Sequence, residues 1–469
     1  YWSKKWFSDV FISSFNTELG VLRGSHIGNL TDLQSALQRN IPFYTTDEFS
    51  YTIAAPRQHV NHRLLKVHNK FLINEKQWIE LTYANQYNLR KEFDVRRSGR
   101  SNLPALSLKR TSNFLEGKYH GYLRNNYELK TGIQANWVGN INLPETGILP
   151  LIADYNSLEY GLFTILSKVF NQTTFDFGAR YDWEKRNVAA ISTTIPREII
   201  RYENSYHNLN LMGEVNHEFT KDWRIAYNIG QIYRNPEVNE LYSNGLHQGV
   251  SGIESGDPTL GVERSLKNSL SLHGKSKNKL SLDAMFFIQH IDNYIFLNPQ
   301  NEIRLTIRGA FPVFKYEQTD ARLLGYNLVS SYQATKRIKI LGKYSYLNGY
   351  DKSNNMPLVY MAPNNLYTSF NYQMPELFNL KNVKVELSSR FVFEQKNIFL
   401  SQDFVAPPSS YNLLGFKVSA DKKLSNFKLK IFLRAENVLN TSYREYLNRQ
   451  RYFADDLGLN VVLGLKVSF

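Results

Sequence analysis

The chain has 469 residues, of which 42% are hydrophobic and 14% aromatic, and it contains no cysteine. Its 56 basic and 42 acidic residues give a net charge of +14, and its mean hydropathy is −0.41. No run of about 18 apolar residues occurs, which excludes a transmembrane helix. The basic charge is accompanied by no nucleic-acid recognition motif, so we expect no nucleic-acid partner and an attraction for anions instead.

Eighteen segments are predicted to be strands, because their apolar residues recur at every second position. In chain order they are 5–19, 58–73, 77–93, 105–117, 127–142, 157–170, 173–190, 207–220, 222–235, 261–275, 279–296, 314–333, 336–350, 364–374, 382–398, 409–422, 426–438 and 457–469. Short turns, such as 74–76 and 220–222, alternate with long connections. The long ones include 20–57, 94–104, 143–156, 236–260, 297–313 and 439–456.

The first long connection carries a helix signal. The run Thr31-Asp32-Leu33-Gln34 has the spacing of a capping box, and Leu33, Ala36 and Leu37 form an apolar stripe behind it. We expect a folded loop here, acting either as a structural lid or as part of a binding surface.

The last segment shows the alternation most clearly. Every odd position is apolar: Leu457, Leu459, Val461, Leu463, Leu465, Val467 and Phe469. Inward-pointing lysines, such as Lys428 and Lys430 in the strand before it, are costly in a soluble core but normal in a hydrated lumen. The pattern predicts an all-β protein: a transmembrane, antiparallel, up-and-down β-barrel with one face toward lipid. A tyrosine-rich soluble β-protein is the alternative.

Residues 233–265 form the most specific motif. The sequence Tyr233-Arg234-Asn235-Pro236-Glu237-Val238-Asn239-Glu240-Leu241-Tyr242 is followed by Gly256-Asp257-Pro258-Thr259-Leu260 and by Glu263-Arg264-Ser265. With Gly178–Asp182, Glu436–Asn440 and the terminal strand, it resembles the TonB-dependent receptors of the bacterial outer membrane. From charge alone, we expect Arg234 and Arg264 to pair with Glu240 and Glu263, more for structure than for ligand contact.

The resemblance implies a 22-stranded barrel with an N-terminal plug domain. Neither the plug nor its TonB-contacting segment is recognisable in this sequence. We therefore expect residues 1–469 to be the barrel domain of a longer receptor, with the plug and about four strands upstream.

The candidate ligand-binding residues come from three segments. Residues 20–62 resemble Bacteroidetes-type ferric-citrate and siderophore receptors, which implicates Arg23, His26, Arg57 and His59. The loop with Arg96, Arg97 and Arg100 suits carboxylate or phosphate groups, which arginine binds bidentately. The alternatives for this loop are contact with lipopolysaccharide phosphates or simple solvation. Tyr242 and His247 belong to the 233–265 motif.

We expect no enzyme activity, no cofactor and no metal site. No nucleophile set or phosphate loop is present. His59 and His62 are three apart, so they point to opposite faces of a strand.

The favoured function is outer-membrane import of a scarce nutrient, such as a ferric siderophore or a ferric-citrate-like complex. The resemblance implies energy from the inner-membrane TonB complex, acting through the plug. The expected partners are this anionic complex, outer-membrane lipid and lipopolysaccharide, and a surface lipoprotein or another outer-membrane protein. The alternatives are a passive porin, a structural barrel in a secretion or surface complex, and a soluble β-rich binding protein.

Overall fold

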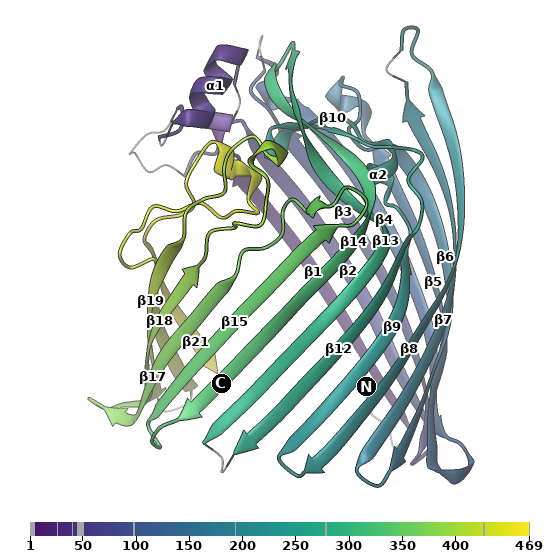
Figure 1. Ribbon diagram of the computed structural model, residues 1–469, viewed down its shortest axis with the longest axis vertical. Helices are drawn as coiled ribbons and strands as arrows, with labels where there is room; N and C mark the ends of the chain where they lie inside the picture. Colours follow the sequence, from purple (N-terminus) through teal and green to yellow (C-terminus); the bar gives the residue numbers. More distant parts are fainter. Residues whose placement is uncertain are drawn as a thin grey trace.

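A computed structural model describes residues 5–25, 27–39, 41–44, 51–96, 99–192, 194–276, 279–424 and 427–468. The described strands form one sheet of 21 members. Figure 1 shows the long strands tilted around a common axis, as in a β-barrel. Consecutive long strands pair antiparallel along the whole chain. Their alternating directions place short turns at one end, below in Figure 1, and long loops at the other. None of the described helices is both long and apolar enough to cross a membrane.

All eighteen predicted strands are present. They are β1 (Trp6–Gly20), β2 (Arg57–Asn74), β3 (Gln77–Phe93), β4 (Pro104–Tyr122), β5 (Tyr127–Asn142), β6 (Asp154–Phe170), β7 (Thr173–Ile191), β8 (Ile199–Thr220), β9 (Trp223–Arg234), β12 (Glu263–Ser276), β13 (Leu280–Thr306), β14 (Gly309–Gln333), β15 (Ile338–Asp351), β17 (Asn365–Leu377), β18 (Leu380–Val392), β19 (Tyr411–Leu424), β20 (Phe427–Glu436) and β21 (Asn460–Ser468).

The remaining described elements lie in the long loops, except η3, which lies in the short turn between β4 and β5. They are α1 (Leu30–Gln38), α2 (Val238–Tyr242), the short strands β10 (Asn244–His247), β11 (Gly252–Ser255) and β16 (Met356–Pro357), and seven single-turn helices. These helices are η1 (Arg23–Ser25), η2 (Arg100–Asn102), η3 (Arg124–Asn126), η4 (Pro144–Thr146), η5 (Gln248–Val250), η6 (Leu400–Gln402) and η7 (Arg449–Tyr452).

The outer face of the sheet is apolar. Ile133, Leu162, Tyr181 and Leu209 follow one another across four paired strands, with exposures of 65, 57, 45 and 51%. Exposed hydrophobic side chains repeated on consecutive strands form the lipid-facing band of a transmembrane barrel. On β21, Val461, Leu463, Leu465 and Val467 are likewise exposed, which confirms the predicted facing for the described part of that strand. Phe469 lies outside the described residues.

The inner face carries charged pairs. Lys118 on β4 contacts Glu80 at 3.3 Å and Glu116 at 3.1 Å. Arg180 contacts Asp182 at 2.6 Å on β7. Such pairs are stable because the lumen is hydrated. Among the described residues, β1 pairs only with β2 and β21 only with β20.

Two predictions about the loops are corrected, those for the connection 297–313 and for the cap of the first helix. Residues 297–313 are no open connection, because β13 and β14 continue as a hairpin with Thr306 paired to Gly309. The predicted loop 236–260 contains α2 and the β10–β11 hairpin. α1 is present with Leu33 and Ala36 buried, but its N-cap is Asn29, whose side chain accepts from the Asp32 N–H at 2.8 Å. Thr31 is already helical, so it does not cap the helix.

We expect Ile133→Arg to prevent stable assembly, because an arginine on the lipid face near the middle of β5 costs about 2–4 kcal/mol. The matched control is Gln134→Arg, which places the same charge on the next residue, in the lumen. Heat-modifiable electrophoretic mobility measures the folded fraction of each variant. Equal loss of folded protein in both variants would contradict the facing assignment.

Candidate ligand-binding site

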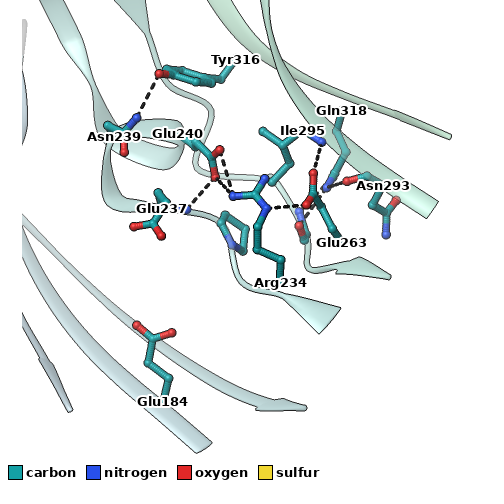
Figure 2. A network of polar contacts seen from close by, with 12 residues as sticks. Glu184, Arg234, Glu237, Asn239, Glu240, Glu263, Asn293, Ile295, Tyr316 and Gln318 are labelled. Atoms are coloured by element: carbon teal, nitrogen blue, oxygen red, sulfur yellow. Dashed lines mark hydrogen bonds and ion pairs between the residues drawn. The ribbon is translucent and has the colours of Figure 1, made fainter. Parts of the chain in front are cut away.

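A charged network fastens the loop that follows β9 (Figure 2). Arg234, the last residue of β9, pairs with Glu240 at 2.9 Å and with Glu263 at the start of β12. Glu240 also accepts from the Glu237 N–H at 2.7 Å and so caps α2. Glu263 accepts from the Ile295 N–H at 2.6 Å. Both carboxylates are engaged by protein groups, as a structural role requires.

The fourth residue predicted for this network does not belong to it. Arg264 donates to Asp292 at 2.9 Å on the neighbouring strand. Glu263 and Arg264 are adjacent on β12, so their side chains point to opposite faces of the sheet. The prediction that Arg264 shares the Arg234 network was therefore wrong.

Tyr242 ends α2 and is buried beside the upper ends of β7 and β8. Its hydroxyl donates to Asn204 at 3.0 Å, and its ring stacks on Tyr202 at 4.4 Å between centroids. Val238 and Leu241 of α2 are buried with it, against Ala153 and Val188. These contacts hold α2 in place and start β10 beside the cavity described below.

His247 lies on β10 and contacts Glu254 on β11. Its Nδ1 is 3.0 Å from the Glu254 carboxylate, which also receives Arg449 at 2.6 Å. Burial raises the pKa of Glu254, but the hydrogen bond from His247 and the charges of His247 and Arg449 outweigh it, so the pKa is lowered. Arg449 belongs to η7, so its pair with Glu254 joins the β10–β11 hairpin to the loop between β20 and β21. The hairpin is also held by β14, with which β11 pairs.

A hydrophobic cluster connects loops from distant parts of the chain. We call it the loop cluster; its buried members are Ile27, Leu33, Ala36, Ala310, Phe314, Tyr452 and Phe453. Beside it, the fully buried Arg451 pairs with Asp403 and donates to the Ala406 carbonyl at 3.1 Å. The Ala310 N–H donates to the Ile27 carbonyl at 3.0 Å. The β13–β14 hairpin is thereby anchored against the first loop.

Between this hairpin and the loops after β3 and β5 lies a cavity of about 1040 Å³. Four arginines line it, namely Arg96, Arg100, Arg304 and Arg308, and no acidic side chain of a described residue does. The rest of its wall is mainly apolar, with Leu106, Ile148, Leu149, Leu151, Leu246, Ile253 and Ile307. We call this space the arginine cavity.

The four arginines differ in how far the protein neutralises them. Arg304 donates to Glu302 at 2.8 and 2.9 Å. Arg308 lies 3.7 Å from the buried carboxylate of Asp94. In the amide orientation that satisfies both neighbours, Gln248 donates to Asp94 at 2.9 Å and accepts from Arg308 at 3.0 Å.

Within the described part of the chain, neither Arg96 nor Arg100 forms an ion pair with a carboxylate. Arg96 donates to the Thr146 carbonyl at 3.4 Å. Burial lowers the pKa of Arg308, the charge of Arg96 lowers it further, and Asp94 offsets part of the change. An anion in the cavity would supply the negative charge that these guanidinium groups lack.

The structure brings together only some of the predicted ligand residues. Arg96 and Arg100 line the arginine cavity, while Arg97 and His26 lie outside the described residues. The others contact protein groups elsewhere: Arg57 pairs with Glu18 at 3.0 Å, His59 contacts Asn16 at 2.7 Å, and Arg23 lies over the Tyr44 ring at 4.8 Å. Arg304 and Arg308 were missed, although two arginines in the predicted long connection 297–313 were a usable signal.

The described residues contain no group of three or more His, Cys, Asp or Glu side chains that could hold a metal ion. The arginine cavity is thus the site whose composition points most directly to a ligand.

Comparisons with known proteins show which family and which solved structures this β-barrel resembles. The family model for the TonB-dependent receptor-like β-barrel matches residues 6–438. The copper transporter OprC is 16% identical with a TM-score of 0.69, over 88% of this chain and 66% of its own. The FrpB iron transporter of Neisseria meningitidis (F5-1 variant) is 14% identical with a TM-score of 0.70, over 98% of this chain and 70% of its own.

The ferric-catecholate import receptor Fiu of E. coli K12 is 13% identical with a TM-score of 0.67, over 98% of this chain and 72% of its own. At such identities the likeness concerns the fold. The chain spans about two thirds of the length of these proteins. No curated protein matches this sequence.

We expect Asp403→Asn to destabilise the loop cluster, because it leaves the buried Arg451 without its counter-charge, at a cost of about 3–5 kcal/mol. Asp292→Asn is the control, since its pair with Arg264 is exposed to solvent and contributes little to stability. Limited proteolysis of the 399–408 and 441–456 loops measures the difference. Equal protection of both variants would contradict the structural role of Asp403.

We also expect the double variant Arg96→Ala and Arg100→Ala to weaken the binding of ferric citrate and to flatten its salt dependence, because two uncompensated cations are lost. Arg197→Ala with Arg201→Ala is the matched control, since both are exposed at the same end but do not line the cavity. The measurement is equilibrium binding at low and moderate salt. Unchanged affinity at both salt concentrations would remove the arginine cavity as a capture site.

Proposed function

This chain belongs to the TonB-dependent receptor β-barrel family of the bacterial outer membrane, and we propose that it captures an anionic metal complex outside the cell and takes part in its active import. The family is one of receptors rather than enzymes. In this orientation the long loops are external and the short turns are periplasmic. The arginine cavity then opens on the side from which a nutrient arrives.

The observation that carries the proposal is the charge of the arginine cavity. Four arginines and no described acidic side chain surround about 1040 Å³ of space. This volume is at the upper end of the range typical of small-molecule sites. Arginine forks suit carboxylate and similar oxyanion groups, and the apolar wall suits the organic part of a chelator. A ferric siderophore or a ferric-citrate-like complex has this chemistry.

The ordered external loops favour a ligand-binding receptor over a passive porin. The loop cluster and the buried pair of Arg451 with Asp403 hold the loops in one arrangement beside the cavity. A porin needs a wide, hydrated path and gains nothing from a preformed cavity. A structural barrel in a surface complex also has no use for four converging cations.

The energetic part of the proposal concerns the longer receptor. We propose that residues 1–469 are its barrel domain, and that a plug with a TonB-contacting segment precedes it. Two observations support this arrangement. OprC, FrpB and Fiu, which share the fold, are longer than this chain, and the outer edges of β1 and β21 have no partner strand among the described residues. A lumen of this size leaks unless it is filled.

We expect cells producing the complete gene product to import ferric citrate only while the proton gradient is intact. An uncoupler should abolish uptake and leave surface binding unchanged, because capture needs no energy. The measurement is uptake of radiolabelled iron with and without the uncoupler. Uptake that persists unchanged would make the passive porin the better function, and binding without any uptake would favour the structural role.

A further inference from the structure

A cluster of basic residues lies on the outer face of the barrel, near the external ends of β2, β3 and β4. Its members are Arg57, His59 and Arg63 on β2, Lys91 on β3 and Lys109 on β4. We call these five residues the outer basic patch. None of them lines the arginine cavity, so the two residues among them that the sequence predicted as ligand-binding, Arg57 and His59, belong to a different surface.

The strand register fixes the direction in which the patch faces. The lipid-facing Ile133 on β5 pairs with Gly117 on β4, which pairs with Leu81 on β3, and Leu81 pairs with Asn69 on β2. Directly opposite residues share a face of the sheet, and residues of one parity share a face of a strand. The odd positions of β2, β3 and β4 therefore face outward, and all five patch residues occupy odd positions.

Lys91 is at the centre of the patch. It lies directly opposite His59. Lys109 lies opposite the position two residues before Lys91, and Arg57 lies opposite the position two residues after it. Such diagonal neighbours have Cα atoms about 7–8 Å apart. Like charges at this spacing on one face repel each other unless an anion lies between them.

Two of the cations have carboxylate partners. Arg57 pairs with Glu18 at 3.0 Å, and Lys91 pairs with Glu145 at 2.9 Å. A lysine carries three hydrogen-bond donors and an arginine five. One carboxylate for each cation therefore orients these side chains and leaves them able to bind a further anion.

The other two cations have no such partner. Within the described part of the chain, neither Arg63 nor Lys109 forms an ion pair with a carboxylate. Arg63 lies over the Tyr87 ring, with 6.0 Å between its guanidinium carbon and the ring centroid. With His59 neutral, the lysines and arginines of the patch exceed its two carboxylate partners by two positive charges.

The patch lies at the level of the lipid headgroups. Ile133 is near the middle of β5, and its partner Gly117 is on the same strand as Lys109. A strand that rises about 3.3 Å per residue at a tilt of about 45° places Lys109 about 19 Å above Gly117. The hydrocarbon core extends about 15 Å to each side of the midplane. Lys109 is therefore outside the hydrocarbon, and the neighbouring Tyr87 is of a residue type enriched at this interface.

The segments proposed to precede residue 1 leave the patch accessible. A plug fills the lumen, on the opposite side of the barrel wall. Upstream strands extend the sheet sideways from the free edge of β1. Since neighbouring strands are about 4.8 Å apart, a strand added next to β1 lies about 19 Å from β4. A carboxylate on that strand is too far away to neutralise Lys109.

Outward-facing charges farther round the barrel are arranged differently. Lys185 on β7 pairs with Glu203 on β8 at 2.7 Å, and Arg264 on β12 pairs with Asp292 on β13 at 2.9 Å. Arg322 on β14 is a single outward arginine. None of these places combines four lysine or arginine side chains, as the outer basic patch does.

We propose that the outer basic patch binds the phosphate groups of a phosphorylated glycolipid in the outer leaflet, such as lipopolysaccharide. Arginine binds phosphate oxygens through its planar fork, and lysine acts as a point charge beside it. On the same outward face, the exposed Leu65 and Tyr83 lie on the membrane side of these cations and can contact acyl chains. Cations above an apolar surface fit a lipid better than a free anion. The inference requires the outer-membrane location of the barrel and is independent of the proposed import.

The test uses the purified complete receptor, freed of lipid in a neutral detergent, with bisphosphorylated lipid A as the probe. Native mass spectrometry measures the fraction of receptor that carries the probe across a titration. The triple variant Arg63→Gln, Lys91→Gln, Lys109→Gln should bind it at least about tenfold more weakly than wild type. Lipid A without its phosphates should bind wild type no better than the probe binds this variant.

Three controls separate the patch from net charge and from free phosphate. Lys185→Gln with Arg197→Gln and Arg201→Gln removes the same number of cations from β7, β8 and their connecting loop, and should keep wild-type affinity. Exchanging lysine and arginine for each other at the three patch positions keeps the charges and should preserve binding. Inorganic phosphate at the same phosphate concentration should not displace the probe, because it has no acyl chains.

Three results would overturn the inference. They are wild-type affinity in the glutamine triple variant, an equal loss of affinity in the control on β7 and β8, and displacement of the probe by inorganic phosphate. Heat-modifiable mobility checks that each variant is folded. If the triple variant does not fold, Arg63→Gln with Lys109→Gln replaces it, since this change breaks no ion pair among the described residues. The expected loss is then at least about fivefold, and unchanged affinity has the same meaning.

Discussion

The structure depends on one constraint: in lipid, every backbone N–H and C=O must find a partner within the protein. Eighteen long strands in a continuous antiparallel ladder meet it, except at the outer edges of β1 and β21, which have no partner strand among the described residues. Because side chains alternate across each strand, satisfying the backbone also divides the residues into two sets. Ile133, Leu162 and Tyr181 therefore meet lipid, while their sequence neighbours line the lumen.

The placement of charged side chains follows from this division between a lipid-facing and a lumen-facing set. Ion pairs such as Lys118 with Glu80 are tolerated because the inner face is hydrated. The outer face carries charge near its external end, where the cations of β2–β4 outnumber their carboxylate partners. The outer basic patch and the arginine cavity are thus two separate positive surfaces at the external end of the barrel.

The order of the external loops has a different physical origin. Outside lipid, water can satisfy backbone groups, so order must come from packing and buried polar contacts. The loop cluster supplies the packing, and Arg451 with Asp403 supplies a buried charge pair. A buried pair of this kind contributes less to net stability than to a single arrangement, because a misplaced partner leaves a bare charge inside the protein. In this receptor that arrangement fixes the β13–β14 hairpin beside the arginine cavity.

The sequence by itself determined the barrel, its strands and its lipid face, because a period of two is a local property that any half-buried strand displays. The predicted bounds of β3 and β5 agree with the structure to the residue. The extension of β13 and β14 through 297–313 escaped prediction, since a hairpin outside lipid has no lipid-facing alternation.

The site was predicted only in part for a related reason. Arg96 and Arg100 stood out as a dense basic loop, but Arg304 and Arg308 lie about 200 residues further along the chain. Their meeting depends on how the barrel curves and how the loop cluster packs. The sequence pattern shows which residues are charged, and only the tertiary structure decides which of those charges are left without a partner.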